Sequence, residues 1–252
     1  MLCVPWRTLA GWSSEPGELS RIGPVTAGVA RDLAWAAPAD VTCQWRVIVV
    51  GRPGQALAVT KIRRLGSVAS GRSDSAVSAA AGANGQAGAV PGVVGCITLT
   101  VPASLLNPLA MPAAQDLAVA GGLAKILERA LQAGADAFGV QRSQVRPGSC
   151  THEEASPGYR VPDPMRALVE ARDRTCGFPT CRQPAWRCEQ DHTIAYRLGG
   201  ATCPCNLSAE CSRHHHLKHL PSWRLEQPRP GFLTWTTPAR LTHTVSPGQY
   251  PV

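Results

Sequence analysis

The sequence predicts an α+β protein, with a mainly helical, partly irregular N-terminal region followed by a smaller C-terminal unit of strands and a helix. Three observations lead to this fold class. Apolar residues recur at helical spacing in two upstream stretches, a segment rich in alanine, glycine and serine interrupts the chain, and cysteines and histidines gather between Cys176 and His219. Glycine and proline, at 24 and 22 of 252 residues, add irregular connections.

The first 65 residues predict one helix and one hairpin. Proline stands at a suitable first helical position at residue 24, and the apolar residues after it recur at i, i+4 and i+8, namely Val25, Val29 and Leu33. Residues 44–60 consist of two β-rich stretches on either side of a Gly-Arg-Pro-Gly turn, which predicts a hairpin. We therefore assign residues 1–65 to a partial helical N-terminal domain that includes this hairpin.

The middle of the chain is expected to contain a linker, a strand, a helix and a loop. Residues 66–95 are dominated by small side chains, which is typical of a flexible linker or insertion. A strand is expected at residues 93–101, and apolar periodicity predicts a helix over residues 113–138. Residues 140–160 carry two Pro-Gly pairs and are expected to form a loop. We therefore assign residues 96–160 to a helix plus a loop.

The chain changes character at about residue 161, where a unit spanning residues 161–250 is expected to begin. Asp163 is a good N-cap with proline directly after it, so a helix is expected up to Asp173. A strand and turn are expected over residues 187–196, and a further helix over Ser208–Leu220.

The charge and the cysteine content narrow the class of protein. The formal net charge is +8 and the pI is about 9.2, which suits a polyanionic partner, although many basic proteins have none. No stretch approaches 18 uninterrupted apolar residues, so we expect no membrane span, and the first residues lack the pattern of a signal peptide. We therefore expect a cytoplasmic protein, in which clustered cysteines are thiolate ligands more often than disulfides.

Four of the clustered residues have the spacing of a structural zinc site. Cys176 and Cys181 flank a compact turn, while Cys211 and His214 lie three apart on the expected helix and therefore on one face. Two ligands from a turn and two from a helix make a closed Cys3His tetrahedron, which suits Zn2+. Other cysteines of the same window remain competing ligands, namely Cys188, Cys203 and Cys205.

A second group in the same window has the residue types that hydrolyse phosphodiester bonds. Neutral imidazole suits a general base at pH 7, and a divalent cation must stabilise the charge that develops on phosphate. Asp191 is a hard oxygen ligand appropriate to Mg2+ or Mn2+, and His215 adds a nitrogen ligand. The Asn206 amide can bridge loop backbone and imidazole. Taken alone, the neighbours Asp191 and His192 would be interpreted as a pair of surface residues. Their position beside the predicted zinc ligands instead favours a catalytic role.

These residues resemble the HNH endonuclease (ββα-metal) family, and most closely its actinobacterial 13E12-repeat proteins. The histidine, asparagine and histidine after which the family is named would correspond to His192, Asn206 and His215. The resemblance depends on four segments, which are Ala171-Arg-Asp-Arg-Thr-Cys-Gly-Phe-Pro-Thr-Cys181, Cys188-Glu-Gln-Asp-His192, Gly199-Gly-Ala-Thr-Cys-Pro-Cys-Asn-Leu207 and Cys211-Ser-Arg-His-His-His-Leu-Lys218. Upstream, residues 16–24 resemble part of the family's helical N-terminal domain, here shortened at the front.

The resemblance implies a role for each residue of the second group. His192 looks like the general base, Asp191 and His215 look like ligands of a catalytic Mg2+ or another divalent ion, and Asn206 looks like the orienting residue or, in some relatives, a metal ligand. The zinc set would be Cys176, Cys181, Cys211 and His214. Three consecutive histidines leave the assignment open by one position through His216, and His219 is a further candidate ligand.

The resemblance also implies double-stranded DNA as the partner, bound mainly through its phosphates. Basic residues near the motif are the candidate contacts, although a solvated surface explains each as well: Arg182, Arg187, Arg197, Arg213 and Lys218. The alternatives to an endonuclease are a catalytically inactive zinc-binding module that grips nucleic acid or protein, and a folded fragment of a degraded gene without a role. DNA specificity, the physiological metal, the biological role and the oligomeric state are not given by the sequence.

Overall fold

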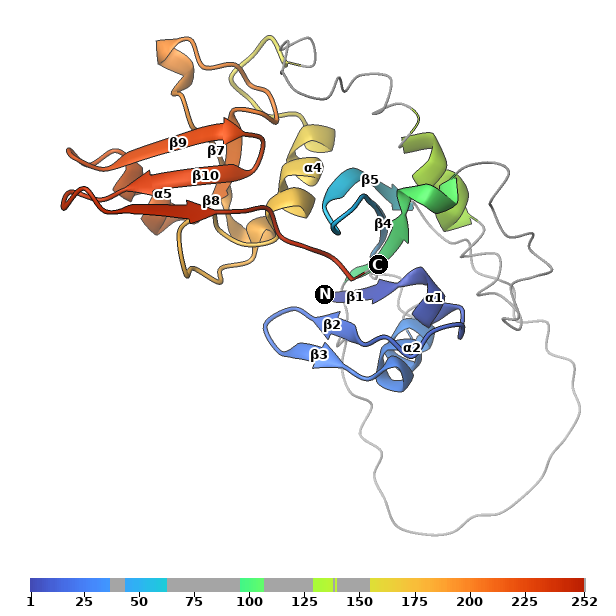
Figure 1. Cartoon of the computed structure of the whole chain (residues 1–252). Coiled ribbons are helices and arrows are strands. Elements are labelled where there is room, and N and C mark those ends of the chain that lie inside the picture. Colours follow the sequence, from blue (N-terminus) through green and yellow to red (C-terminus); the bar gives the residue numbers. More distant parts are fainter. Residues whose placement is uncertain (37–43, 63–95, 107–128, 138, 140–154, 252) are drawn as a thin grey trace, which may run out of the picture.

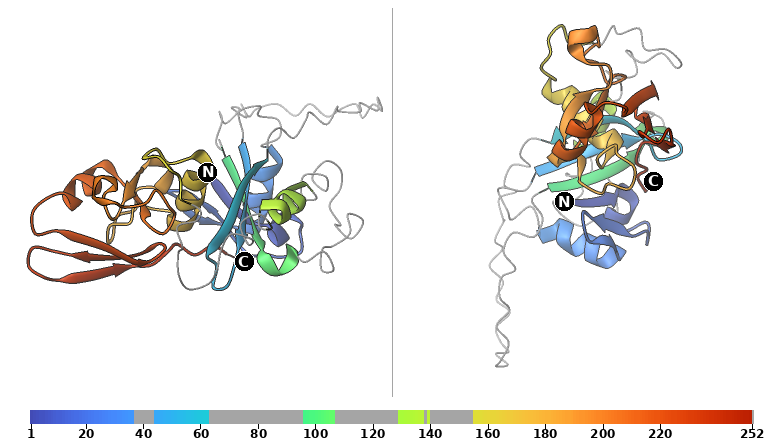
Figure 2. Two further views of the ribbon diagram at one scale, coloured as in Figure 1. Left: turned by 90° about the horizontal axis from the view of Figure 1, so that it is seen from above. Right: turned by 90° about the vertical axis from the view of Figure 1, so that its left-hand side faces the viewer.

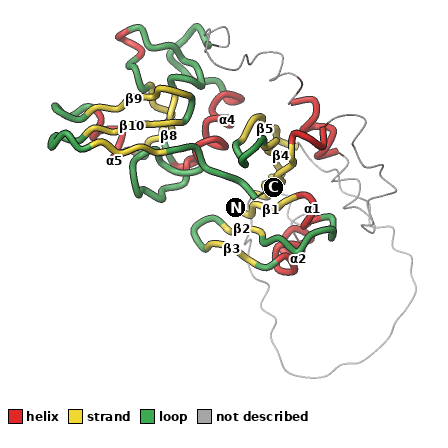
Figure 3. Tube along the Cα trace, in the orientation of Figure 1, coloured by secondary structure: helices red, strands yellow, loops and turns green. Residues whose placement is uncertain are grey.

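The computed structural model describes residues 1–36, 44–62, 96–106, 129–137, 139 and 155–251 (Figures 1 and 3). Its N-terminal part is a six-stranded sheet of order β3-β2-β1-β6-β4-β5. The parallel strands β1, β6 and β4 lie in the middle, and the outer strands pair antiparallel. The strands are β1 (Leu2–Pro5), β2 (Gly17–Leu19), β3 (Gly23–Val25), β4 (Gln44–Val50), β5 (Ala56–Ile62) and β6 (Cys96–Pro102).

The prediction that the N-terminal region is mainly helical is wrong, because the described part of this region is rich in strands. Its helical segments are α1 (Trp6–Leu9), α2 (Ala27–Ala36), the 3-10 helix η2 (Ala103–Leu106) and residues 129–137. The cause lies in β1, which has only four residues and so shows no periodicity in the sequence. Its neighbour β6 follows it by more than ninety residues, and pairing at that separation leaves no local trace.

Several local predictions for this region can be compared with the structure. The hairpin predicted at residues 44–60 is confirmed as β4 and β5, and the strand predicted at 93–101 is confirmed as β6 from Cys96 onward, where the described residues begin. The first helix begins at Ala27, not at residue 24, because Pro24 lies in the edge strand β3, where a missing N–H costs no ladder bond. Of the helix predicted at 113–138, residues 129–137 are helical. The predicted linker 66–95 lies outside the described residues.

The sheet is covered on both faces, and alternate residues of its strands divide between two cores. Val47 and Val49 of β4 point into the larger core, which α1, α2 and the helical residues 129–137 close. Ile48 and Val50 point to the opposite face, where they meet Ala171 and Tyr250 from the C-terminal part. Each fully buried aliphatic side chain contributes about 1.5–3 kcal/mol, so these apolar residues stabilise the packing on both faces of the sheet.

The C-terminal part contains two small sheets and two helices. Antiparallel β7 and β8 form one sheet, and antiparallel β9, β10 and β11 form the other. The second sheet has its own small core of Leu225, Leu233 and Trp235, and the Trp235 indole donates to Gly177 O at 2.9 Å. The elements are α4 (Asp163–Asp173), β7 (Glu189–His192), β8 (Leu207–Glu210), α5 (Ser212–Lys218), β9 (Arg224–Arg229), β10 (Phe232–Thr236) and β11 (Thr242–Val245).

The predicted elements of this part are partly confirmed. The helix predicted up to Asp173 is confirmed as α4, although its N-cap is Pro162 and the predicted cap Asp163 is already its first helical residue. The strand predicted over residues 187–196 is confirmed only at Glu189–His192. The helix predicted from Ser208 is wrong in its first turn, because Leu207–Glu210 is a fully buried strand that pairs with β7, and α5 begins only at Ser212.

Helix α4 joins the two parts, because it lies between the large sheet and the rest of the C-terminal part (Figures 1 and 2). The end of the chain returns to the sheet: the buried Tyr250 hydroxyl donates to Ala171 O of α4 at 2.8 Å, and Thr100 of β6 donates to Pro251 O at 3.0 Å. In the described part of the chain, no helix has the length and apolar content needed to cross a membrane.

Candidate functional site

Cys176, Cys181, Cys211 and His214 form a group of donors that can hold a metal ion. Their ligand atoms all lie within 4.8 Å of one another. Cys176 and Cys181 come from the turn after α4, Cys211 is the N-cap residue of α5, and His214 lies in the first turn of that helix. His214 Nδ1 lies 3.2 Å from Cys211 Sγ and 3.4 Å from Cys176 Sγ. Three thiols and one imidazole that converge on one point are a donor set of the kind that binds zinc.

Neighbouring groups hold these donors in place. The Phe178 ring stacks on the His214 ring with centroids 3.9 Å apart, and Cys211 N donates to Cys176 Sγ at 3.3 Å. Glu210 is fully buried beside the group, with Oε2 3.4 Å from Cys176 Sγ, and its burial raises the pKa of its carboxyl to about 8. A hydrogen bond with Cys188, followed by burial, raises the pKa of the Cys176 thiol. Cys188 is therefore a neighbour of the predicted ligands.

Asp191 and His215 meet where α5 packs against β7 and β8, and His192 follows Asp191 as the last residue of β7. Asp191 Oδ1 lies 3.5 Å from His215 Nε2, and Asp191 Oδ2 lies 2.5 Å from Lys218 Nζ. The other ring nitrogen of His215, Nδ1, lies 2.7 Å from Glu189 Oε2. Because Asp191 and Glu189 are two apart on β7, their side chains lie on the same face of the strand, toward His215.

His192 is buried, with 4% of its surface exposed. Its Nε2 lies 2.8 Å from the hydroxyl of Thr202, and its ring stacks on that of Tyr159 with centroids 5.3 Å apart. Burial lowers the pKa of His192, an effect that the negative charge of Asp191 partly offsets. Lys218 Nζ donates to His192 O at 2.6 Å, so one ammonium group ties together the backbone and the carboxylate of two successive residues. The lowered pKa favours the neutral imidazole, and the contacts with Thr202 and Tyr159 hold the ring in one orientation.

Asn206 fastens the loop between the two strands. Its Oδ1 accepts from Ile194 N at 2.8 Å, and its Nδ2 donates to Ile194 O and to Ala201 O, both at 3.0 Å. These three bonds go to backbone groups, and none of the described contacts joins the amide to the His192 ring. Asn206 thus shapes the loop that carries Thr202, and it reaches His192 through the loop instead of through a direct hydrogen bond.

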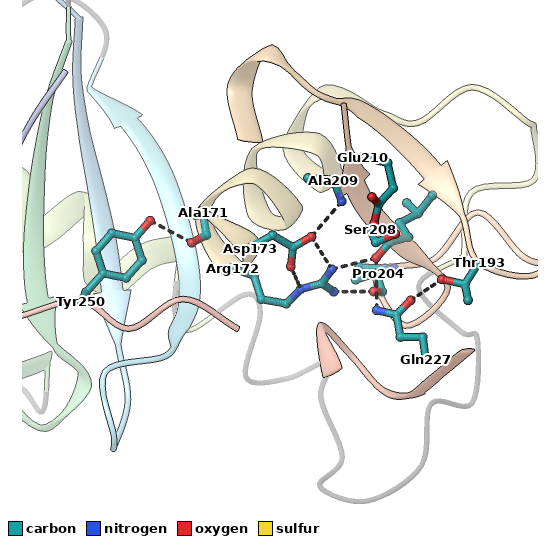
Figure 4. A network of polar contacts seen from close by, with 11 residues as sticks. Ala171, Arg172, Asp173, Thr193, Pro204, Ser208, Ala209, Glu210, Gln227 and Tyr250 are labelled. Atoms are coloured by element: carbon teal, nitrogen blue, oxygen red, sulfur yellow. Dashed lines mark hydrogen bonds and ion pairs between the residues drawn. The ribbon is translucent and has the colours of Figure 1, made fainter. Parts of the chain in front are cut away.

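A buried ion pair links α4 to this loop and to β8 (Figure 4). Arg172 lies 2.6 Å from Asp173 Oδ1, and its other nitrogens donate to Pro204 O at 2.6 Å and Leu207 O at 2.7 Å. Asp173 in turn accepts from Ala209 N at 2.9 Å. Pro204 and Leu207 stand on either side of Asn206, so the pair fixes the backbone from which that amide projects.

The remaining candidate residues divide between exposed arginines and residues of α5 or its C-cap that lie close to Asp191 and His215. Arg182, Arg187, Arg197 and Arg213 are exposed, as phosphate contacts would be, whereas the Lys218 side chain is only 8% exposed and already engaged. His216 Nδ1 lies 2.7 Å from Ser212 O, and the His219 ring lies beside the His215 ring with centroids 5.2 Å apart. Sequence reasoning missed Glu189, Thr202 and Tyr159, because only folding brings them to the histidines.

Comparison with known proteins finds relatives of unknown function. The chain is 41% identical over 112 residues to uncharacterized protein Rv2100 and 40% identical over 111 residues to uncharacterized protein Rv3776, both of Mycobacterium tuberculosis. These matches cover 44% and 43% of this chain, which spans about a fifth of the length of either relative. No protein-family model matches the chain, and no solved structure matches it significantly.

Proposed function

We propose that this chain is a metal-dependent DNA endonuclease of the HNH type, which hydrolyses phosphodiester bonds. One observation carries the proposal: a carboxylate and an imidazole, Asp191 Oδ1 and His215 Nε2, lie 3.5 Å apart, and the buried imidazole of His192 follows Asp191 directly in the chain. Beside them stands a Cys3His group with the composition of a structural zinc site. A general base, a carboxylate and an imidazole that can bind a divalent metal, and a separate structural centre are the parts of a site for metal-assisted hydrolysis.

The donors fit two different metals. The thiol-rich group suits Zn2+, and all four of its ligand atoms come from protein side chains, as in structural sites. Asp191 and His215 offer one oxygen and one nitrogen, which suits Mg2+, Mn2+ or another divalent ion that keeps water ligands. When bound there, such an ion would stabilise negative charge on the phosphate and the leaving oxygen.

His192 is the proposed general base. Its Nε2 lies 2.8 Å from Thr202 Oγ1, and the same hydroxyl lies 3.5 Å from Tyr159 O, which can only accept. A hydroxyl that donates to this carbonyl accepts from Nε2–H, so the neutral ring carries its lone pair on Nδ1. The lowered pKa of His192 favours this neutral form at pH 7, and the ring can then take a proton from an attacking water molecule.

The remaining residues position this base. Asn206 holds the backbone of Ile194 and Ala201, and therefore the loop on which Thr202 lies. Lys218 holds His192 O and partly neutralises Asp191. Exposed arginines supply positive charge for the phosphates, and we expect salt-sensitive binding to double-stranded DNA. Arg197 lies in the 3-10 helix η5 (Tyr196–Leu198), in the loop that Asn206 fastens.

One contact favours a second function. Lys218 Nζ lies 2.5 Å from Asp191 Oδ2, so a protein cation already balances the carboxylate that is proposed to hold the catalytic metal. A protein with a permanent ion pair at this position would be a catalytically inactive zinc-binding module that grips nucleic acid or protein. The two functions differ in one measurable property, which is the cutting of DNA.

A plasmid-nicking assay separates the two functions. Supercoiled plasmid is incubated with the protein and Mg2+, Mn2+, Ni2+ or Zn2+. We expect the His192→Ala variant to nick about 10²–10⁴-fold more slowly than the wild type, because it lacks the base. The matched control is His243→Ala, which removes an exposed histidine of β11 and should leave the rate unchanged. Equal rates for the wild type and His192→Ala, with zinc retained in both, would contradict the proposal, whereas DNA binding without nicking would support the inactive module.

A further inference from the structure

Two tyrosines form an aromatic cluster with His192. The Tyr159 ring stacks on the His192 ring at an interplanar angle of 16°, and the Tyr196 ring meets both edge-on, 5.6 Å from Tyr159 and 5.8 Å from His192. His192 is buried, yet Tyr159 is 67% exposed. One face of the Tyr159 ring therefore lies on the imidazole, and its exposure leaves the other face open to a partner.

The segment that carries Tyr159 is fixed in place. Ser156 N donates to Thr202 O at 2.8 Å, and the Tyr196 hydroxyl donates to Pro157 O at 3.2 Å. Thr202 Oγ1, which contacts His192, also lies 3.5 Å from Tyr159 O. The open ring is therefore held by the same residues that orient the proposed base. A flat side chain that is exposed and already ordered loses little entropy when a ligand stacks on it.

The surroundings of Tyr159 have the chemistry of a nucleic-acid contact. Large apolar side chains that a water-exposed loop does not require flank Tyr196 in the chain, with Ile194 at 59% and Leu198 at 69% exposed. Each tyrosine is followed by an exposed arginine, Arg160 after Tyr159 and Arg197 after Tyr196. Aromatic faces interleaved with cationic side chains bind nucleic acid by stacking on bases and pairing with phosphates.

Building on the proposed function, we propose that Tyr159 is a stacking platform for an unpaired base, and that the preferred substrate is DNA with unpaired nucleotides next to the cleaved bond. Inside a regular duplex, both faces of each base are covered by neighbouring bases. Only a base released from the stack can lie on the open face of Tyr159. Because the opposite face of Tyr159 contacts His192, a nucleotide base held on the open face is separated from the proposed general base by one aromatic ring.

A binding experiment tests the platform without depending on cleavage. Fluorescence anisotropy compares a labelled duplex with the same duplex carrying a central mismatched bubble, with no divalent salt added. We expect the wild type to bind the bubble roughly tenfold more tightly, and Tyr159→Ala to lose this preference, because one stacked base accounts for about that factor. Tyr159→Phe keeps the ring and should keep the preference. The matched control is Trp35→Ala, which removes an exposed aromatic ring of α2.

The outcomes distinguish this inference from the proposed function. Equal binding of duplex and bubble by the wild type, or an undiminished preference in Tyr159→Ala, would overturn the platform even if plasmid nicking is observed. Loss of the preference in Tyr159→Phe would also overturn it, because the hydroxyl and not the ring would then be responsible. A bubble preference that depends on Tyr159, in a protein that nicks no DNA with any metal, would leave the platform standing and remove the endonuclease. Zinc content and melting temperature, measured for each variant, show that the fold is retained.

Discussion

At the scale of single residues, the adjacent glycines Gly199 and Gly200 allow the loop backbone to pack closely against the Asn206 side chain. Gly199 has a φ of 88°, a conformation that glycine adopts without strain, and it ends the 3-10 helix η5. A Cβ atom at Gly200 would overlap Ile194 O and would lie 2.8 Å from Asn206 Nδ2. The Asn206 amide contacts the backbone of residues 194 and 201 because no side chain stands between them.

We predict that Gly200→Ala destabilises the protein by about 1–3 kcal/mol, because the added methyl group meets backbone that cannot move away cheaply. The same change should weaken nicking, because it shifts the loop that carries Thr202. Urea unfolding measures the first effect and the plasmid assay the second. Gly28→Ala is the control: it lies in α2 with open space around its Cβ position, and it should stabilise by about 0.5–1 kcal/mol. An unchanged unfolding free energy for Gly200→Ala would contradict the prediction.

At the scale of the elements, α4 connects the two halves of the protein. Its Ala171 packs against the large sheet, while its last residues, Arg172 and Asp173, reach across to β8 and to the loop before it (Figure 4). Arg172 makes two bonds to one carboxylate and two to separate carbonyls, a pattern that suits the planar guanidinium and that lysine cannot reproduce. Two adjacent side chains of α4, Arg172 and Asp173, therefore tie β8 to this helix.

We predict that Arg172→Met costs about 3–5 kcal/mol of unfolding free energy, because it leaves the buried Asp173 carboxylate and two backbone carbonyls without their partner. Arg166→Met, an exposed position on the same helix, should change stability by less than about 0.5 kcal/mol. Denaturant titration of both variants gives the comparison. Similar midpoints for the two would show that the network contributes no more than a surface charge does.

At the scale of the whole molecule, the two parts are stabilised by different means. The sheet has a contiguous apolar core on one face, with Leu2, Ile97 and Leu99 completely buried. The C-terminal part has only small apolar clusters, of which one consists of Leu225, Leu233 and Trp235 and the residues packed against them. Cores this small do not offset the conformational entropy of so long a segment, which is why small domains rely on a structural metal.

We predict that purified protein contains one zinc per chain, and that Cys181→Ser or chelation unfolds the C-terminal part while the large sheet persists. Structural zinc contributes on the order of 10 kcal/mol to the folding of small domains. Hydrogen exchange should therefore show lost protection in β7, β8 and α5, with β4 and β6 still protected. Cys96→Ser, which alters a half-buried cysteine of β6 outside the group, should retain zinc. Folded wild-type protein without zinc would contradict this account.

Features that depend on near neighbours along the chain could be predicted from the sequence. Cys176 and Cys181 share one turn and Cys211 and His214 share one helical turn, so their spacing alone predicts a ligand group, and the structure brings the four together. The β4–β5 hairpin is equally local, because its turn lies between its strands. Helix α4 follows from its proline near the start and its apolar face.

Features that depend on contacts between distant segments became visible only in the folded chain. The strand β1 is recognisable as part of a sheet only because it pairs with β6. The residues from Ser208 to Glu210, which were expected to be helical, form part of the buried strand β8 because they pair with β7. The partners of His192 could not be predicted either, since Thr202 and Tyr159 come from loops whose own sequences carry no such signal. The physical reason is the same in each case: a contact between remote segments is selected by burial and backbone hydrogen bonding in the folded chain, and local composition does not encode it.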